Sequence, residues 1–376
     1  MPARKKLTVI IGSGFSRQAG IPTTAGDKEL RGVNDCFLNP SLNMNSRGIP
    51  VPDTTPQNIS DTISEILLDF WKKVFGYVGS GALPSLEDHF TIIDLATASG
   101  HALGGYSPKE LRAIRRLSIH RVFQILGNVA PDYLIVGKVV HRLLESFDVT
   151  FVSLNWDTLV EDTLWKLSLQ STTKWRPIYC IDEEFIDTEY DGVPVPLLKM
   201  HGGANWLYCE RCRKVYYKFY PEYSALRCSA YLDKDDFELL KKNLDPQTFA
   251  FAKESCKICS SPLSSRLATF SYRKAFSIPH FQITWQKALD SLRDADHWLI
   301  FGYSLPGADF EFKHLLKTAQ LAKPSGERPI LEATKGHDGA SEKRYRECFG
   351  SEVNLSANTL ADWELERLVK FIEENA

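Results

Sequence analysis

Four short clusters in the sequence carry the residue types from which a ligand site is built. They are Gly12–Ser16, Asn155–Asp157, His201–Gly203 and Gly302–Ser304, and each follows a run that is expected to form a buried strand. In an open parallel sheet, ligands bind outside the carboxyl ends of the strands. We therefore expect the four clusters to meet at one edge of a sheet.

The Gly12–Ser16 loop follows the apolar run Leu7–Ile11 and continues through Arg17 to Pro22. Glycines let the backbone approach a phosphate, and the N–H groups of a following helix face the anion. The spacing is not G-x-G-x-x-G, because Arg17 takes the place of the third glycine, and no G-K-S/T follows. The loop is therefore either a phosphate cradle or an ordinary strand–turn–helix corner, and Arg17 is either a ligand contact or a solvated helix residue.

Eight cysteines are present, and four of them form two C-x-x-C pairs, Cys209 with Cys212 and Cys256 with Cys259. Each pair can place two thiolates on one metal, and two pairs complete a tetrahedral, structural zinc site. The alternatives are reduced cysteines without metal or a redox pair. Cys228 lies between the pairs and could replace one ligand, although we favour the four paired cysteines.

The polar residues at two other strand ends each have a functional and a structural interpretation. His201 is a candidate general base, since its ordinary pKa suits proton transfer near neutrality, or a histidine satisfied by backbone. Asp157 either contacts a ligand or caps the following helix. Asn155 could hydrogen-bond a ribose hydroxyl or hold a water molecule.

The Gly302–Ser304 cluster leads into a loop that ends near Asp309. Gly302 would permit close backbone approach and Ser304 would donate to a phosphate or a ribose. The segment is otherwise a plain strand-to-helix loop, with Asp309 in the first turn of the helix. Glu87 and Asp88 are interpreted as an acidic pair in the first turn of another helix, where the helix dipole favours them.

The spacing of apolar residues predicts the elements that position these clusters. Expected strands are 7–11, 148–153, 193–200, 297–301 and 329–332, and expected helices are 24–36, 85–97, 108–128, 131–146, 158–168, 280–294, 308–320 and 359–374. Strands that alternate with helices indicate an α/β fold with a doubly wound parallel sheet. Residues from about 60 to 146 are expected to form a helical insertion.

The composition is that of a globular protein, with 376 residues, 43% hydrophobic, 24% charged and a net charge of −2. No apolar run approaches the ~20 residues that span a bilayer, and the five-residue run after the basic N-terminus is too short for a secretion signal. We expect a cytoplasmic protein that binds no membrane. The charge balance predicts no direct nucleic-acid binding.

The order of these motifs resembles that of the sirtuins. Gly12 to Pro22 resembles the G-A-G-x-S-x-x-S-G-I-P opening, Asn155–Asp157 the N-x-D turn, His201-Gly202 the catalytic His-Gly, and Gly302–Ser304 the late G-T-S turn. The two C-x-x-C pairs follow the histidine, as the sirtuin zinc module does. The resemblance covers about residues 7 to 310.

The resemblance implies a Rossmann-like parallel sheet with helices on both faces, which binds NAD as a substrate, together with a small module that holds structural Zn²⁺. It implies that Asn155 and His201 are catalytic. The residues implied to contact NAD are Gly12, Ser13, Gly14, Ser16, Asp157, Gly302 and Ser304. The implied zinc ligands are Cys209, Cys212, Cys256 and Cys259.

Three departures separate the chain from the deacylases of this family. Thr23-Thr24 stand where the deacylases carry Asp-Phe-Arg, residues 270–276 lack the substrate-pairing V-x-F-G-E, and the segment 60–146 is larger than its counterpart. These features resemble the sirtuin-like NAD⁺ hydrolases of bacterial antiphage defence. They imply an NAD⁺ glycohydrolase that cleaves NAD⁺ to nicotinamide and ADP-ribose. The alternatives are an NAD-dependent protein lysine deacylase and a non-catalytic sensor of NAD or ADP-ribose.

An activity that depletes NAD⁺ has to be latent until it is triggered. By analogy with the family we expect a homo-oligomer, with a HerA-like ATPase, an Argonaute-type protein or a phage-derived protein as partner or trigger. The expected organisation is a Rossmann-like domain built from 1–58, 148–204 and 271–376. It is interrupted by a helical insertion, 59–147, and a zinc-binding module, 205–270.

Overall fold

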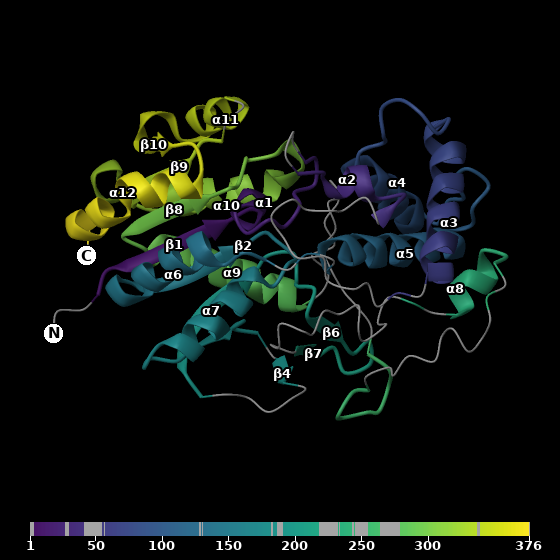
Figure 1. The fold of residues 1–376 in the computed structure, drawn as a ribbon, viewed down its shortest axis with the longest axis horizontal. Coiled ribbons are helices and arrows are strands. Elements are labelled where there is room, and N and C mark those ends of the chain that lie inside the picture. The colour runs from purple at the N-terminus through teal and green to yellow at the C-terminus, as the bar shows by residue number, and fades with distance from the viewer. Residues whose placement is uncertain are drawn as a thin grey trace.

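The computed structural model describes residues 4–26, 30–40, 55, 57–127, 129, 131–181, 183–185, 191–217, 232, 234–242, 244, 255–263, 279–336 and 339–375. Figure 1 shows a sheet with helices on both faces at one side of the molecule and a group of helices at the other. A second, small sheet lies beneath the junction between them.

The large sheet has seven strands in the order β10-β9-β8-β1-β2-β5-β3, and all of its pairings are parallel. The strands are β1 (Lys6–Ile11), β2 (Asp148–Ser153), β3 (Trp175–Ile178), β5 (Val193–Lys199), β8 (His297–Phe301), β9 (Ile330–Thr334) and β10 (Val353–Ala357). Apart from the edge strand β3, this order is the doubly wound 3-2-1-4-5-6 arrangement. Successive strands are added in one direction from β1 to β5 and in the opposite direction from β8 to β10, so the strand order reverses between β1 and β8, and the crevice at this switch point is where such sheets bind ligands.

The pairing register brings the ends of four strands level with one another. Ile11 of β1 pairs with Ser153 of β2 and with Phe301 of β8, and Ser153 pairs in turn with Lys199 of β5. The loops that follow these residues therefore start at the same edge of the sheet. The predicted convergence of the four clusters is confirmed.

Alternate residues of the central strands face two separate cores, as the two-residue period of a strand requires. Leu7, Val9 and Ile11 pack with α6 (Leu134–Ser146), α7 (Leu159–Gln170) and α12 (Leu360–Asn375). Ile10 packs on the opposite face with α9 (Pro279–Asp294), α10 (Phe310–Leu321) and α11 (Ala340–Phe349). The predicted α/β sheet with helices on both faces is thus confirmed.

A third core lies inside the helical group of α2 (Val33–Cys36), α3 (Gln57–Phe75), α4 (Leu86–Ser99) and α5 (Pro108–Gly127). It also includes Trp156 and Ala204, which belong to loops of the sheet domain. Helix α8 (Lys234–Leu239) is joined to α5 by the ion pair of Arg116 with Asp236. Because α6 packs on the sheet instead, we propose that the helical insertion ends before α6.

The expected helix over 24–36 is wrong. Thr23, Thr24 and Gly26 lie in a turn, Gly26 forms a bridge with Arg31, and only Val33–Cys36 is helical. The Thr23 hydroxyl accepts from the N–H of Gly26 at 3.1 Å instead of capping a helix. The propensities of the segment favoured a helix, but Gly26 has φ +70°, a backbone conformation outside the helical region.

Strands β3 and β10 and helix α11 were not predicted from the sequence. β3 is four residues long and contains Pro177, and β10 alternates apolar and polar residues over only five positions, V-N-L-S-A. The polar helix α11 buries only Ser341, Tyr345 and Phe349. Each element is too short or too polar to show a clear period.

The small sheet has the order β4-β7-β6, from β4 (Glu183–Phe185), β7 (Val215–Tyr217) and β6 (Trp206–Tyr208).

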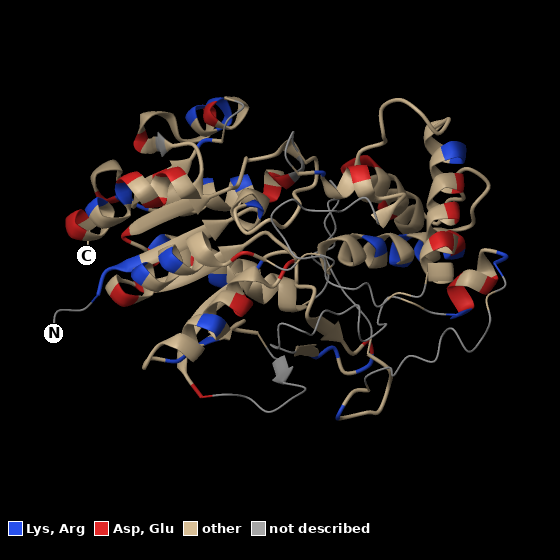
Figure 2. Ribbon diagram, viewed as in Figure 1, with Lys and Arg blue, Asp and Glu red and all other residues tan. Residues whose placement is uncertain are grey.

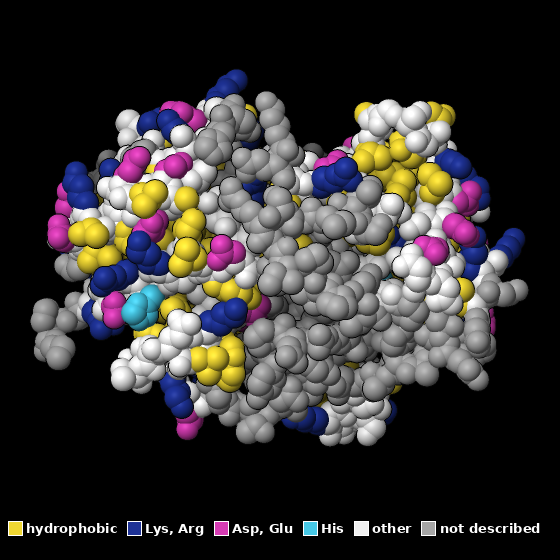
Figure 3. Space-filling model, viewed as in Figure 1, with side chains coloured by type: hydrophobic (Ala, Val, Ile, Leu, Met, Phe, Trp, Pro, Cys, Tyr) yellow, Lys and Arg dark blue, Asp and Glu magenta, His cyan; other side chains and the backbone are white. Residues whose placement is uncertain are grey.

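Positive and negative side chains are mixed along α3, α11 and α12 (Figure 2). Leu134, Leu365 and Val369 are largely exposed, and Figure 3 shows apolar side chains over this part of the surface. Among the described residues, no helix has the length and apolarity to cross a membrane.

Candidate functional site

Asn155 lies in the turn after β2 and is tied to the Gly12–Ser16 loop. Its amide nitrogen donates to the carbonyl oxygen of Gly12 at 2.9 Å and to the hydroxyl of Ser16 at 2.8 Å. The Gly12 oxygen can only accept, so the nitrogen, and not the oxygen, of the amide must point there. Both amide protons are thus used, and the group that Asn155 offers to a ligand is its carbonyl oxygen.

The Ser16 hydroxyl also forms a hydrogen bond with Asp157. It donates to Asp157 Oδ2 at 2.8 Å, while Asp157 Oδ1 accepts from the N–H of Leu159 at 3.1 Å, at the start of α7. Asp157 therefore serves the helix start, as its structural interpretation proposed, and also anchors the glycine loop. Ser16 is buried, whereas Asn155 and Asp157 are half-buried.

His201 follows β5 and is buried, with its imidazole held in one orientation. Its Nδ1 lies 3.1 Å from the carbonyl oxygen of Leu154. A carbonyl only accepts, so Nδ1 carries the proton and Nε2 is the basic nitrogen. Nε2 lies 3.9 Å from Oδ1 of Asp309. A histidine in this tautomer can take a proton at Nε2.

Gly12, Gly14 and Gly302 are required by the contact of two loops with each other. The N–H of Gly14 donates to the Gly302 carbonyl at 2.9 Å. A Cβ on Gly302 would lie 2.0 Å from the nitrogen of Phe15, and φ is +62° there. A Cβ on Gly12 would lie 2.5 Å from the Gly302 oxygen. These glycines thus let the β1 and β8 loops pack together beside the crevice.

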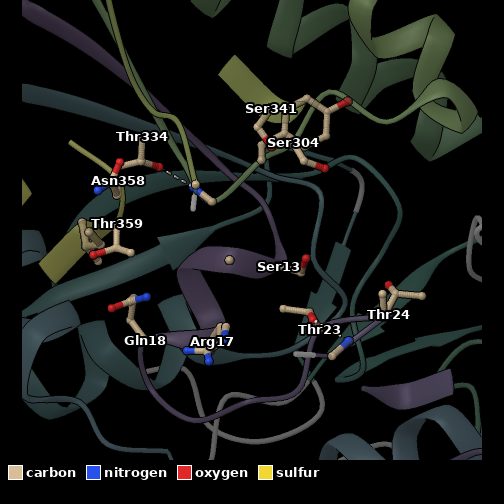
Figure 4. Close-up of a pocket in the computed structure, with 17 residues that line it drawn as sticks. Ser13, Arg17, Gln18, Thr23, Thr24, Ser304, Thr334, Ser341, Asn358 and Thr359 are labelled. Atoms are coloured by element: carbon tan, nitrogen blue, oxygen red, sulfur yellow. Dashed lines mark hydrogen bonds between the residues drawn. The ribbon is translucent and has the colours of Figure 1, made fainter. Parts of the chain in front are cut away.

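A cavity of about 630 Å³ opens where these two loops meet. Figure 4 shows hydroxyl and amide side chains around it, with Ser13 central and Ser304 and Ser341 at one end. The lining residues are Ser13, Gly14, Arg17, Gln18, Thr23, Thr24, Ala25, Gly26, Gly302, Tyr303, Ser304, Thr334, Gly336, Ser341, Asn358, Thr359 and Leu360. Arg17 is the only charged residue among these lining residues.

The predicted site residues fall into two adjoining groups. Ser13, Gly14, Gly302 and Ser304 line the cavity, and Gly12 contacts Gly302 without lining it. Asn155, Ser16, Asp157 and His201 lie outside that lining, at the neighbouring strand ends. The Gly12–Ser16 loop joins the two groups, because Asn155 bonds to it from one side and the cavity lies on the other.

Residues in and directly after β9 and β10, and in α11, form a further part of the cavity that was not predicted from the sequence. Thr334 ends β9, and its hydroxyl accepts from the N–H of Gly302 at 3.0 Å. Asn358 and Thr359 directly follow β10, and Ser341 lies in α11. The same strand-end argument would have found Thr334, Asn358 and Thr359 if the last two strands had been placed correctly.

A buried ionic network supports the turn that carries Asn155. Lys199 of β5 lies 3.3 Å from Glu161 of α7, and its ammonium also donates to the backbone oxygen of Asp157. Tyr179 donates to the same Glu161 oxygen at 3.0 Å. Burial, and then the charge of Glu161, raises the pKa of Asp162 to about 8. The network joins the β5 strand end, which leads to His201, to the β2 turn.

The four paired cysteines form one cluster. The ligand atoms of Cys209, Cys212, Cys256 and Cys259 all lie within 4.8 Å of one another, and the Sγ atoms of Cys209 and Cys259 are 3.6 Å apart. Zn–S bonds of about 2.3 Å in a tetrahedron place sulfurs at about this separation. The donor set therefore fits the predicted structural zinc site. Cys228 and the stretch 270–276 lie outside the described residues.

The Tyr216 hydroxyl lies 3.0 Å from the sulfur of Cys256. Burial raises the pKa of Cys256, but hydrogen bonds from Tyr216 and from backbone N–H groups outweigh it and lower this pKa to about 6. A thiolate is the form that binds zinc. Hydrogen bonds with Ser261 also lower the pKa of Cys259, whereas burial raises the pKa of Cys209 and the contact with Cys259 raises that of Cys212, so two of the four sulfurs favour the thiolate without metal.

No protein-family model matches the chain, and a search of the curated proteins finds no match. Among solved structures, the chain is similar to one described as the structural basis for the mechanism and regulation of Sir2 enzymes. The identity is 12% and the TM-score 0.43, over 99% of this chain and 93% of that one. It is also similar to a complex described as Sir2-p53 peptide-NAD+, with 14% identity and a TM-score of 0.38, over 99% of this chain and 93% of the other.

Proposed function

We propose that the chain is an NAD⁺ glycohydrolase that releases nicotinamide and ADP-ribose. The observation that carries the proposal is the arrangement of Asn155 and His201. Both follow strand ends beside the glycine loop that lines the cavity; the amide nitrogen of Asn155 bonds to that loop and Nδ1 of His201 faces the Leu154 carbonyl, so the amide oxygen of Asn155 and Nε2 of His201 are the acceptor atoms of the pair. A water molecule and sugar hydroxyls are the donors that such acceptors would orient.

The lining of the cavity supports a dinucleotide as the ligand. Neutral hydroxyl and amide groups match ribose hydroxyls and an adenine edge, and Arg17 provides positive charge beside Ser13 and Gly14 for a pyrophosphate. The cavity volume of about 630 Å³ is that of a small-molecule site. The ligand would lie across the β1–β8 switch point, as in other doubly wound sheets.

The reaction needs an orienting group, a base and a water molecule. The oxygen of water attacks C1′ of the ribose, and the C1′–N bond breaks with its electron pair passing to the pyridine ring, which leaves as neutral nicotinamide. Asn155 would orient the water through its carbonyl oxygen. His201 Nε2 would take the proton that the water loses. Asn155 and His201 are thus the proposed catalytic residues.

The turn at Thr23–Gly26 favours hydrolysis over transfer to an acylated lysine. The backbone oxygens of Thr23 and Thr24 accept from the N–H groups of Val33 and Asn34 at 2.9 and 3.0 Å. The turn is therefore pinned to α2, and Thr23 and Thr24 both line the cavity. Two short threonines provide no aromatic shield between the reacting sugar and water.

The experiment is the release of nicotinamide from NAD⁺ without any acylated peptide. Asn155→Ala and His201→Ala are each expected to lower the rate by at least about 100-fold, the usual contribution of a positioned acid–base group. The affinity for ADP-ribose, which isothermal titration calorimetry measures, should fall much less than the rate in both variants. Gly326→Ala is the matched control, since nothing lies within 4 Å of a Cβ there.

Three other results of this experiment would each change the proposal in a different way. Release that requires an acylated peptide would instead make the chain a deacylase, which the retained cysteine cluster also fits. ADP-ribose binding without turnover under any activating condition would make it a sensor. Undiminished release by either alanine variant would remove that residue from the mechanism.

An NAD-depleting role in bacterial antiphage defence is the biological part of this proposal. It rests on the resemblance of the sequence motifs. Such an enzyme would be latent and then activated in a homo-oligomer, by a HerA-like ATPase, an Argonaute-type protein or a phage protein. Mass analysis of proteins that copurify with the full chain tests the partner.

A further inference from the structure

We propose that Lys199 is a positioning residue, whose buried ammonium holds Asn155 and His201 at a fixed spacing from each other. The inference rests on the proposed hydrolase function and deepens it, because it names a third side chain on which that reaction depends. Lys199 is the last residue of β5, and its side chain is only 1% exposed. It is not among the lining residues of the cavity, so its effect on the reaction would pass through the two proposed catalytic residues.

Lys199 is joined to the turn that carries Asn155. Its ammonium donates to the backbone oxygen of Asp157, two residues after Asn155. The side chain of Asp157 bonds in turn to the Ser16 hydroxyl and to the N–H of Leu159. Loss of the ammonium would remove the donor to the Asp157 oxygen, and the β2 turn could then shift against the glycine loop.

The turn that carries His201 packs on the same side chain. Lys199 precedes His201 by two residues, and the N–H of Gly202 donates to the Lys199 backbone oxygen at 3.2 Å. A Cβ on Gly203 would lie 3.1 Å from Lys199 Cε and 2.7 Å from Asn205 Oδ1. The glycine thus lets the turn lie directly against the lysine stem, so a displacement of the stem would also displace His201.

Glu161 of α7 balances the charge of the ammonium and holds it in place. Its Oε1 lies 3.3 Å from Lys199 Nζ and accepts from the Tyr179 hydroxyl at 3.0 Å. The Tyr179 oxygen accepts in turn from Asn205 Nδ2 at 2.7 Å, so the network reaches both ends of the turn after β5. Asp162, whose pKa is raised to about 8 by burial and then by Glu161, keeps its proton near neutral pH. Lys199 and Glu161 therefore form a balanced buried pair.

A buried ion pair can also serve the stability of the fold alone, and the two roles differ in where the loss appears. A pair that only stabilises the fold changes the amount of folded enzyme, so its loss lowers the rate by the same factor in any background. A positioning residue lowers kcat only while the groups that it positions are present. Asn155 and His201 would act as a unit, and effects within such a unit are strongly non-additive.

The test compares the double variant Lys199→Met/Glu161→Gln with the wild-type full chain. Methionine keeps an unbranched stem without the ammonium, and glutamine avoids the unpaired buried charge that Lys199→Met alone would leave. We expect kcat for nicotinamide release to fall about 10- to 100-fold, with ADP-ribose affinity unchanged within about twofold. In an Asn155→Ala background, the same double change should lower the residual rate less than about threefold.

Two further variants accompany this comparison. Gly203→Ala, which would place a methyl group 3.1 Å from the lysine stem, should also lower kcat more than it lowers ADP-ribose affinity. Lys317→Met is the matched control, because Lys317 of α10 also donates to a backbone oxygen, that of Cys348, at 2.7 Å. Its other printed donor contact is with Gln320, and neither partner belongs to the two turns, so this variant should keep the wild-type kcat.

An equal fractional loss of rate in the wild-type and Asn155→Ala backgrounds would overturn the proposal, since the pair would then only stabilise the fold. Wild-type kcat in the double variant would also overturn it and would leave the hydrolase proposal intact. Equal losses of rate and of ADP-ribose affinity would count against positioning in the same way. Absence of wild-type release under all activating conditions would refute both proposals.

Discussion

The contact between the β1 and β8 loops gives a sharp prediction at Gly302. In Gly302→Ala the new Cβ would lie 2.0 Å from the Phe15 nitrogen and 2.3 Å from the Gly14 carbonyl carbon. All of these neighbours are backbone, so no flexible side chain can move aside. The two loops must separate, and the hydrogen bonds that join them are lost.

The magnitude follows from the structure. An alanine at φ +62° costs about 1 kcal/mol or more. Separation of the loops breaks the bonds from the N–H groups of Gly12 and Gly14 to the carbonyls of Phe301 and Gly302, each 2.9 Å long and each worth about 1 kcal/mol. The free energy of unfolding should therefore fall by about 3 kcal/mol. The affinity for ADP-ribose should fall at least about tenfold, because Gly14 and Gly302 line the cavity.

Denaturant unfolding and calorimetric titration with ADP-ribose measure the two effects. Gly307→Ala, in the same loop, is the control. Nothing lies within 4 Å of a Cβ there and φ is not positive, so both quantities should stay close to wild type. If Gly302→Ala kept wild-type stability and affinity, the loops would not be packed as described, and the assignment of the cavity to the dinucleotide would lose its basis.

Two more predictions concern the metal site and the helical core. The purified protein should contain about one zinc ion per chain. Cys259→Ser should lose the zinc and unfold at a lower temperature, whereas Cys348→Ser, which lies outside the cluster, should retain it. Equal zinc content in the two variants would refute the assignment. Burial lowers the pKa of His89 to about 3, and its neutral ring accepts from Trp71 Nε1 at 3.0 Å. The unfolded state therefore binds the proton more readily than the folded state. The contribution of His89 to the free energy of unfolding should be fully present above about pH 6.5 and should be lost as the pH falls toward 3. Between pH 7 and pH 4.5, urea unfolding should show a smaller loss of unfolding free energy for His89→Gln than for the wild type. An identical loss in the two proteins would show that His89 is not the titrating group.

The sequence was sufficient to locate the half of the site that lies at strands with clear apolar runs. β1, β2, β5 and β8 each have such a run, and the residues after them were recognised as strand ends. Parallel pairing then requires these ends to meet, which the register of Ile11 with Ser153 and Phe301 confirms. The cysteine cluster could also be predicted, because C-x-x-C spacing directly reflects metal geometry.

The remaining half was not predicted, in part because one strand is short and in part because other contacts are tertiary. β10 has only five residues, so its alternating V-N-L-S-A pattern was not recognised and Asn358 and Thr359 were not identified as strand-end residues. Asp309 is an ordinary helix-start residue in the sequence, and only the fold places it 3.9 Å from His201. The glycines were expected to make room for phosphate, whereas the structure uses them first for the contact of two loops.

The helical insertion is a structural part of the site, as the turn at Asn155–Asp157 demonstrates. Asn155 and Asp157 bond to the glycine loop and the helix start, while Trp156 between them is buried in the helical core, 5.6 Å from the ring of Phe123 on α5. The backbone oxygen of Trp156 also accepts from the N–H of Ala204 at 2.7 Å, three residues after His201. A displacement of α5 would therefore move Trp156 and with it the amide of Asn155. The geometry of the proposed catalytic residues thus depends on the packing of the insertion as well as on the sheet.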